Sequence, residues 1–287
     1  MSFELIDENR DSSSVDVLCR ALGVSRSGYY AWRSRPICAR ERANRILALH
    51  IKAIHRESDQ TYGTPRITDE LRDSGISCGH NRVAKIKRRL GLFAVATPRG
   101  YRPPTTQAAS NRRVAPDLVQ RDFVAGQPNK KWVSDITYVP VQGGHVYLCA
   151  ILDLFSRRVV GWSISQSITT DLVITALQRA CQTRRPREDV IFHSDRGTQF
   201  TSEQLHRKLA ENGLTPSVGR KGDCYDNAVA EAFFSTLKIE RINRDRYGTL
   251  QQARRAIERY IRFYNRTRRH STLGNISPDK YEALRAA

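Results

Sequence analysis

The segment WVSDITYV, residues 132–139, decides the fold of the larger part of this chain. Its aromatic and β-branched residues predict a buried β-strand, yet Asp135 stands in the middle of it. An unpaired carboxylate in a buried strand is costly, so Asp135 indicates a function. Two more strands are expected directly after this one, over residues 143–156 and 157–165.

Beyond these strands the pattern alternates between helix and strand. The expected elements are a helix over 169–184, a strand over 189–195, a helix over 202–213, a strand over 214–219 and a helix over 226–241. Three strands, then alternating helices and strands, then helices, are the element order of an RNase H-like α/β core. The sequence therefore predicts that fold for its second half.

Two further acidic residues stand in unusual surroundings. Asp195 ends the short strand in FHSDRGTQF, residues 192–200, where side chains face a cleft. Glu231 lies in the helix of DNAVAEAFFSTLKIE, residues 226–240. A strand Asp, a strand-end Asp and a helical Glu can converge on one point, so we predict that these two residues and Asp135 form a cluster.

Convergent carboxylates repel one another, and a divalent cation relieves the repulsion. Ligand sets made only of oxygen suit Mg²⁺ or Mn²⁺. Two such ions about 3.5–4 Å apart can activate an attacking oxygen and stabilise the leaving one at a phosphorus centre. The alternative, three scattered structural acids, is disfavoured because of the three sequence contexts.

The charge of the chain predicts a polyanionic partner. There are 48 Lys and Arg residues against 29 Asp and Glu, a formal net charge of +19 over 287 residues. Nucleic acid is favoured over a membrane surface, because no apolar run approaches the roughly 18–20 residues of a membrane span. The six cysteines form no C-x-x-C pair, which is typical of reduced packing residues, and no signal peptide is apparent. A cytoplasmic, nucleoid-associated protein is expected.

The N-terminal region predicts two all-helical DNA-binding units. Residues 14–33 are interpreted as a helix-turn-helix, with a turn at Gly23 and Ser25 or Ser27 capping the second helix. A plain pair of antiparallel helices is the alternative.

A second helical unit follows, with a long helix over 38–57, a helix beginning near Thr64 and a short basic helix over 80–90. On the last helix DNA contact is favoured over a solvated charged face. Its candidate DNA-binding residues are Lys85, Arg88 and Arg89.

The resulting domain division has five parts. We expect a first helix-turn-helix over 1–36, a second helical unit over 37–96, a Pro-, Thr- and Arg-rich linker over 97–127, the catalytic core over 128–245 and a basic C-terminal helix and tail over 246–287.

The C-terminal helix carries arginines spaced four, three, four and three residues apart, opposite an apolar seam. With few acids beside them, phosphate contact is favoured over a solvated face. The predicted stripe consists of Arg255, Arg259, Arg262, Arg266 and Arg269.

Three other polar residues are candidates for a place at the site. Asp153 is predicted to hydrogen-bond a turn rather than to bind metal. His193, two residues before Asp195, is interpreted as a structural or supporting residue more readily than as a base. Asn227 is either a DNA contact or a helix cap, and the sequence does not choose between them.

Four strings together carry a resemblance to a known family. These are WVSDITYV, HSDRGTQF at 193–200, DNAVAEAFFSTLKIE, and YNRTRRHSTLGNISP at 264–278. They closely resemble the second-frame product, often called OrfB, of bacterial insertion sequences of the IS3 family, which is similar to retroviral integrases. The resemblance covers nearly the whole chain.

This resemblance implies a DDE transposase in which Asp135, Asp195 and Glu231 bind the metal ions and Lys238 contacts transposon-end DNA. It also implies cleavage and strand transfer at terminal inverted repeats, a circular excised intermediate and assembly on paired ends. Such products are usually accompanied by a fused first-frame segment, so a first-frame partner is also expected.

The sequence leaves two rival functions open. A non-catalytic DNA-binding regulator would occupy the repeats without chemistry, but it has no use for three clustered acids. An RNase H-type nuclease would explain the core but not the two N-terminal units.

Overall fold

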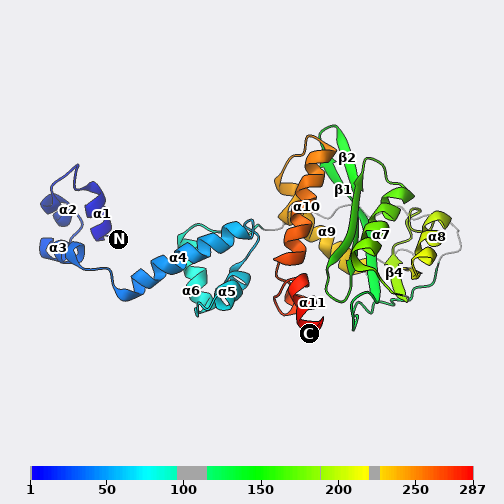
Figure 1. Cartoon of the computed structure of the whole chain (residues 1–287). Helices are drawn as coiled ribbons and strands as arrows, with labels where there is room; N and C mark the ends of the chain where they lie inside the picture. The colour runs from blue at the N-terminus through cyan, green and yellow to red at the C-terminus, as the bar shows by residue number, and fades with distance from the viewer. Residues whose placement is uncertain (1, 96–114, 188, 220–226, 287) are drawn as a thin grey trace.

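The computed structural model describes residues 2–95, 115–187, 189–219 and 227–286. Most of the predicted linker over 97–127 lies outside these ranges, as do residues 220–226. Within them no helix is long and apolar enough to cross a membrane. Figure 1 shows two small helical units followed by a larger body built on a β-sheet.

The larger body is organised by a five-stranded mixed sheet in the order β3-β2-β1-β4-β5. The antiparallel strands β1, β2 and β3 form one half, and β4 and β5 run parallel to β1 in the other. Their bounds are β1 Lys131–Val141, β2 Gly144–Asp153, β3 Val159–Ser165, β4 Val190–Ser194 and β5 Leu214–Val218. This strand order is that of the RNase H-like fold, as the sequence predicted.

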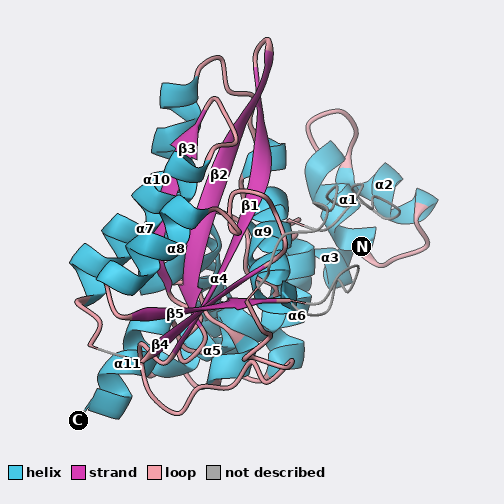
Figure 2. Cartoon of the chain, turned by 90° about the vertical axis from the view of Figure 1, so that its right-hand side faces the viewer, coloured by secondary structure: helices cyan, strands magenta, loops and turns pink. Residues whose placement is uncertain are grey.

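Helices cover both faces of the sheet (Figure 2). Neighbouring residues of β1 point to opposite faces, because strand side chains alternate. Trp132 packs in the cluster under α7 and α8, whereas Val133 packs in the cluster under α9 and α10. The helices are α7 Thr170–Arg184, α8 Glu203–Glu211, α9 Ala228–Glu240 and α10 Leu250–Arg266.

One glycine permits the close approach of α7 to the sheet. A Cβ atom at Gly161 in β3 would lie 2.3 Å from the carbonyl oxygen of Ala176 and 2.7 Å from the Ala180 side chain. No side chain is tolerated at such distances, so only glycine allows this packing.

Each N-terminal unit has a small apolar core of its own. The first unit packs Ile6, Cys19 and Tyr29 together. Its helices are α1 Ser2–Asn9, α2 Val15–Ala21 and α3 Arg26–Ser34. The predicted turn and cap are present, since Gly23 has φ +65° and Ser25 accepts a hydrogen bond from the Gly28 amide at 3.0 Å. The sequence had not predicted α1.

The second unit packs around Ile51, Tyr62 and Leu71. Its helices are α4 Ala39–Glu57, α5 Thr64–Asp73 and α6 His80–Arg89. The short helix α11, Pro278–Ala286, closes the chain and is fixed to the core through Glu282, which pairs with Arg184 of α7 at 2.7 Å.

Candidate active site

Asp135 and Asp195 stand side by side on neighbouring parallel strands. The register pairs Val133 of β1 with His193 of β4, and the two aspartates follow two residues later in each case. Residues two apart on a strand share a face, and adjacent strands lie about 4.8 Å apart. Asp195 directly follows the last residue of β4, where the strand opens towards solvent.

Each aspartate is oriented by one backbone amide. The Ile136 amide donates to Oδ1 of Asp135 at 2.7 Å, and the Gly197 amide donates to Oδ1 of Asp195 at 2.9 Å. A Cβ atom at Gly197 would sit 3.0 Å from that Oδ1 atom, so glycine leaves room for the carboxylate. Among the described residues, no hydrogen bond reaches the second oxygen of either carboxylate.

Helix α9 brings Glu231 to the same place. Ala230, Phe233 and Phe234 bury their side chains against the sheet, which leaves Glu231 on the exposed side of the first turn. The Nδ2 atom of Asn227 donates to the carbonyl oxygen of Ser134, the residue before Asp135, at 3.1 Å. The start of α9 is thereby fixed beside the aspartate pair.

The pKa shifts of the three carboxylates arise from burial and from repulsion between them. Burial, and next the charge of Asp195, raise the pKa of Asp135 to about 8, with a smaller contribution from Glu231. Burial raises the pKa of Asp195, and burial together with Asp195 raises that of Glu231. The charges of Lys238 and His193 oppose these shifts at Asp135 and Asp195 but do not cancel them.

This donor set fits a divalent metal ion. All available ligand atoms are carboxylate oxygens, which Mg²⁺ and Mn²⁺ prefer, and a cation would relieve the repulsion that raises the three pKa values. Over the ranges that the structure describes, no three His, Cys, Asp or Glu side chains stand at the spacing of a finished metal site.

Lys238 lies where its spacing from Glu231 predicts. Its ammonium group is 4.3 Å from the centre of the Tyr138 ring, and its charge lowers the pKa of Asp135. The sequence reasoning missed Tyr138. Strand alternation alone would not have found it, because Tyr138 follows Asp135 by three residues in β1, and only the contact with Lys238 reveals it.

Two supporting predictions are confirmed. The Phe155 amide donates to Asp153 in the turn after β2 at 3.0 Å, and the same carboxylate pairs with Arg184 at 2.9 Å. His193 is buried, with Nδ1 at 2.9 Å from the Ser217 hydroxyl, which is a structural position.

Two of the candidate DNA contacts are buried in the structure. Asn227, for which the sequence left a DNA contact and a helix cap open, donates through its amide group to the β1 backbone. It stands at the cap position of α9 but makes no capping hydrogen bond through its side chain. Arg269 does not continue the stripe, because α10 ends at Arg266 and the Arg269 guanidinium is buried against Glu70 and Asp73.

The other predicted basic residues lie on the surface. The four stripe residues within α10, namely Arg255, Arg259, Arg262 and Arg266, are all exposed. On α6, Lys85, Arg88 and Arg89 are exposed as well. Arg89 pairs with Glu41 at 3.1 Å, and Arg262 pairs with Glu258 at 3.5 Å; both pairs are solvent-exposed and therefore weak.

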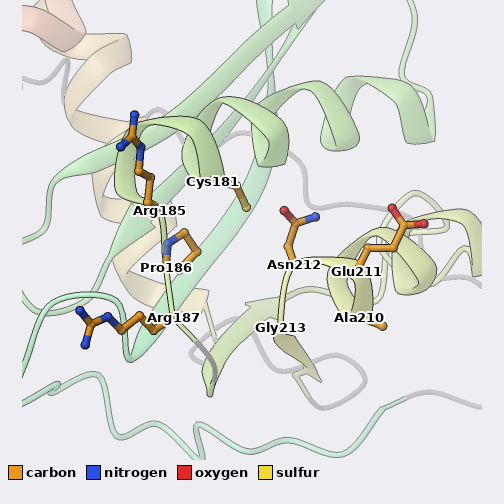
Figure 3. A pocket seen from close by; sticks show the side chains of 8 residues that line it. All are labelled: Cys181, Arg185, Pro186, Arg187, Ala210, Glu211, Asn212 and Gly213. Carbon is orange, nitrogen blue, oxygen red and sulfur yellow. The ribbon is translucent and has the colours of Figure 1, made fainter.

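A pocket of about 510 Å³ lies at the opposite end of the sheet (Figure 3). Its lining comes from the residues after α7 and α8, including Arg185, Arg187 and Asn212. Those residues precede β4 and β5, whereas Asp195 follows β4. The pocket is therefore separate from the carboxylate cluster.

Comparison with known protein families defines the class of protein. Residues 125–224 and 212–278 match family models described as integrase core domain, and residues 41–100 match an HTH-like domain. Together with the sheet order, these matches define a polynucleotidyl transferase with an RNase H-like catalytic core and an HTH-like DNA-binding domain. DNA is therefore its partner, and a core of this kind implies dependence on a divalent metal.

Curated relatives identify the family. The transposase InsF of insertion sequence IS3A from Escherichia coli K12 is 38% identical over 285 residues, which is 98% of both chains. An uncharacterized 31 kDa protein of insertion element IS600 from Shigella sonnei is 39% identical and covers 94% of this chain and 100% of its own. The chain belongs to the IS3 family of DDE transposases.

Among solved structures, the HTLV-2 integrase catalytic core domain aligns with 54% of this chain and 97% of its own, at 18% identity and a TM-score of 0.43. The fold assignment rests on the sheet order and the family matches rather than on this superposition.

Proposed function

We propose that Asp135, Asp195 and Glu231 are the catalytic carboxylates of this transposase and that they bind two Mg²⁺ or Mn²⁺ ions. The observation that carries the proposal is the register of β1 and β4, which aligns the two aspartates beside the first turn of α9. When bound, the ions would supply Lewis-acid activation of the attacking oxygen and stabilise the leaving one.

The residues of the chain have separate tasks in this reaction. Asp135 and Asp195 form the rigid part of the ligand set, because each is held by a backbone amide. Glu231, on the exposed side of α9, completes the set by approaching the pair. Water attack at the element's end frees a 3′-hydroxyl, and that hydroxyl then attacks a second phosphodiester in the same site. No covalent protein–DNA intermediate is needed.

DNA binding is proposed for surfaces on both sides of the linker. Residues 1–36 and 37–96 would bind terminal inverted repeats, with Lys85, Arg88 and Arg89 on α6 among the contacts. In the region over 128–245, Lys238 lies on the same helix as Glu231 and its charge acts on Asp135. There it would contact the DNA phosphate next to the cleaved bond. The stripe in the region over 246–287, from Arg255 to Arg266, would bind phosphates along the duplex.

Assembly on paired DNA ends and help from a first-frame protein are part of the same proposal. Both follow from membership of the family, and the site of action would be the bacterial nucleoid. A regulator that binds repeats without chemistry is the competing function, and the experiment below separates it from the enzyme.

The test is incubation of the purified chain with a labelled duplex of the element's terminal repeat and Mg²⁺ or Mn²⁺. Wild-type protein should cut or join strands only when the ion is present, whereas Asp135→Asn and Glu231→Gln should bind the repeat without cutting it. Asp171→Asn, an exposed acid of α7, is the matched control and should cut normally. Repeat-specific binding without cutting by any protein, including a mixture with the first-frame product, would favour the regulator.

A further inference from the structure

The second helical unit is docked on the last turn of the catalytic helix α9. Asp59, in the loop between α4 and α5, accepts a hydrogen bond from the Arg241 guanidinium at 3.1 Å. The Arg244 guanidinium donates to the carbonyl oxygen of the same residue at 2.7 Å. Arg66 of α5 approaches Glu240, the last residue of α9, at 3.8 Å. The end of α9 is thus held by the unit that precedes the linker.

A second set of contacts joins α5 to the segment after α10. The Tyr62 hydroxyl donates to the carbonyl oxygen of Thr267 at 2.9 Å and accepts from the Arg269 amide at 3.0 Å. The Arg269 guanidinium pairs with Glu70 at 2.7 Å and with Asp73 at 2.8 Å. The Arg269 side chain is only 7% exposed, whereas Glu70 and Asp73 are 27% and 42% exposed, so Arg269 is buried between two acids that remain partly hydrated.

Glu240 connects the two sets. Its carboxylate is buried, and it receives two hydrogen bonds from Arg268 at 2.7 and 2.8 Å and one from the Tyr260 hydroxyl at 2.9 Å. Arg268 is the neighbour of Arg269, so the α5 contacts lead directly to α9. The same helix carries Glu231 in its first turn and Lys238 in its last turn.

The opposite side of the docked unit remains open. Asn81, Lys85 and Arg88 lie four and then three residues apart on α6, which places them on one face, and all three are exposed. Within the described part of the chain their side chains make no hydrogen bond or ion pair. The unit therefore presents a polar and basic helix face to a ligand, while other residues of the unit contact the catalytic body. Figure 1 shows this unit between the first helical unit and the body that contains the sheet.

We propose that this interface fixes the distance between the DNA segment bound by α6 and the phosphodiester placed at the carboxylates, and that it thereby determines where the strand is cut. The inference rests on the proposed function. A catalytic site tolerates errors of only about 1 Å in substrate position, so a loosely tethered binding unit could not define a single cut.

The test compares two triple variants that change the charge equally. The interface variant is Asp59→Asn, Glu70→Gln and Asp73→Asn, which removes the acidic partners of Arg241, Arg244 and Arg269. The control variant is Asp69→Asn, Glu211→Gln and Asp122→Asn. Its acids pair with Arg72, Lys208 and Lys131, none of which contributes to the interface. Both variants move the net charge from +19 to +22, because three carboxylates become amides.

Hydroxyl-radical footprinting on the terminal-repeat duplex without Mg²⁺ measures the spacing of the protected DNA segments under conditions in which the protein does not cut. Wild-type and control proteins should protect two DNA patches at one fixed spacing. The interface variant should keep the patch of α6 and lose or spread the second patch. With Mg²⁺, cut positions mapped at nucleotide resolution should be single for wild type and control and spread over neighbouring bonds for the interface variant.

Identical footprints and identical cut positions for the two triple variants would overturn the proposal. A footprint that changes as expected while no protein cuts DNA would support the positioning role and contradict the proposed catalytic function. Thermal unfolding of each variant checks its folding. If the interface triple variant unfolds, Tyr62→Phe replaces it, because this change removes only the bridging hydroxyl. Unchanged footprint spacing and an unchanged cut position in Tyr62→Phe would likewise overturn the proposal.

Discussion

Asp135 and Asp153 lie on neighbouring strands of one sheet, and burial raises the pKa of both, yet their partners differ. Asp153 is fully buried, accepts hydrogen bonds from the Asn129 and Phe155 amides at 2.8 and 3.0 Å, and pairs with Arg184. Asp135 has one amide partner, and the charge that acts on it most strongly is that of another acid, Asp195. The charge of Asp153 is balanced by Arg184, whereas Asp135 is repelled by neighbouring acids.

The difference separates a structural acid from a functional one. A buried carboxylate that only stabilises the fold needs a cation and hydrogen-bond donors, and β2 and α7 supply them to Asp153. A site that binds a metal ion must keep its ligands free of other partners. Repulsion between those ligands therefore destabilises the fold until the ion binds. Four predictions test this comparison.

Asp135→Asn should reduce DNA cleavage by about 10³-fold or more, because one ligand of the metal pair loses its charge. Binding to the terminal repeat should remain close to that of wild type, and the two activities are measured on the same labelled duplex. Cleavage at more than a tenth of the wild-type rate would remove Asp135 from the catalytic set.

Asp153→Asn should leave the chemistry of the folded protein intact but lower the free energy of unfolding by about 2–4 kcal/mol, because Arg184 loses a buried partner. Urea unfolding monitored by circular dichroism measures this change. The matched variant Asp171→Asn should cost less than about 0.5 kcal/mol, since Asp171 is exposed. Equal stability of the two variants would contradict the structural role of Asp153.

Divalent metal should stabilise the wild-type fold and not that of Asp135→Asn. At an ion concentration 100 times the dissociation constant, linkage predicts about 2.7 kcal/mol for one bound ion. Thermal unfolding with Mg²⁺, Mn²⁺ or EDTA gives the comparison without any DNA. Asp153→Asn should still be stabilised by the divalent ion. Loss of that stabilisation in Asp153→Asn would show that Asp153 also belongs to the metal site.

The smallest expected effect is on pH dependence. The folded protein binds the Asp135 proton more tightly than the unfolded chain, because the pKa rises from 3.8 to about 8. In the absence of metal, raising the pH from about 4 to 8 therefore favours unfolding of wild type relative to Asp135→Asn. We expect a difference of roughly 1–3 kcal/mol at pH 8, reduced by hydration at the open side of the site. Parallel pH profiles of the two proteins would show that Asp135 is already compensated.

The arginines near the end of α10 show where sequence reasoning stopped. Regular spacing correctly placed Arg255 to Arg266 on an exposed face, because helical periodicity is a local property. It failed at Arg269, whose partners Glu70 and Asp73 are almost 200 residues away in the sequence. Charge alone does not distinguish an arginine that binds phosphate from one that joins two domains.

Asn227 shows the same limit at the site itself. Its position four residues before Glu231 indicated a role near the carboxylates, and the structure places it there. Its hydrogen bond to the Ser134 carbonyl depends on how α9 crosses β1, which no local pattern contains.

The sequence by itself determined the strand and helix order of the core and the helix, turn and cap within residues 14–33, and it pointed to three acids as the candidate site. It could do so because periodicity, capping and the cost of a buried charge act over short stretches of chain. The tertiary structure alone decided which acid is compensated by Arg184 and which is left to its acidic neighbours. It also decided that α5 is fixed to the end of α9. Both outcomes depend on pairs of charged groups that are distant in sequence, and their energies arise only when folding removes them from water.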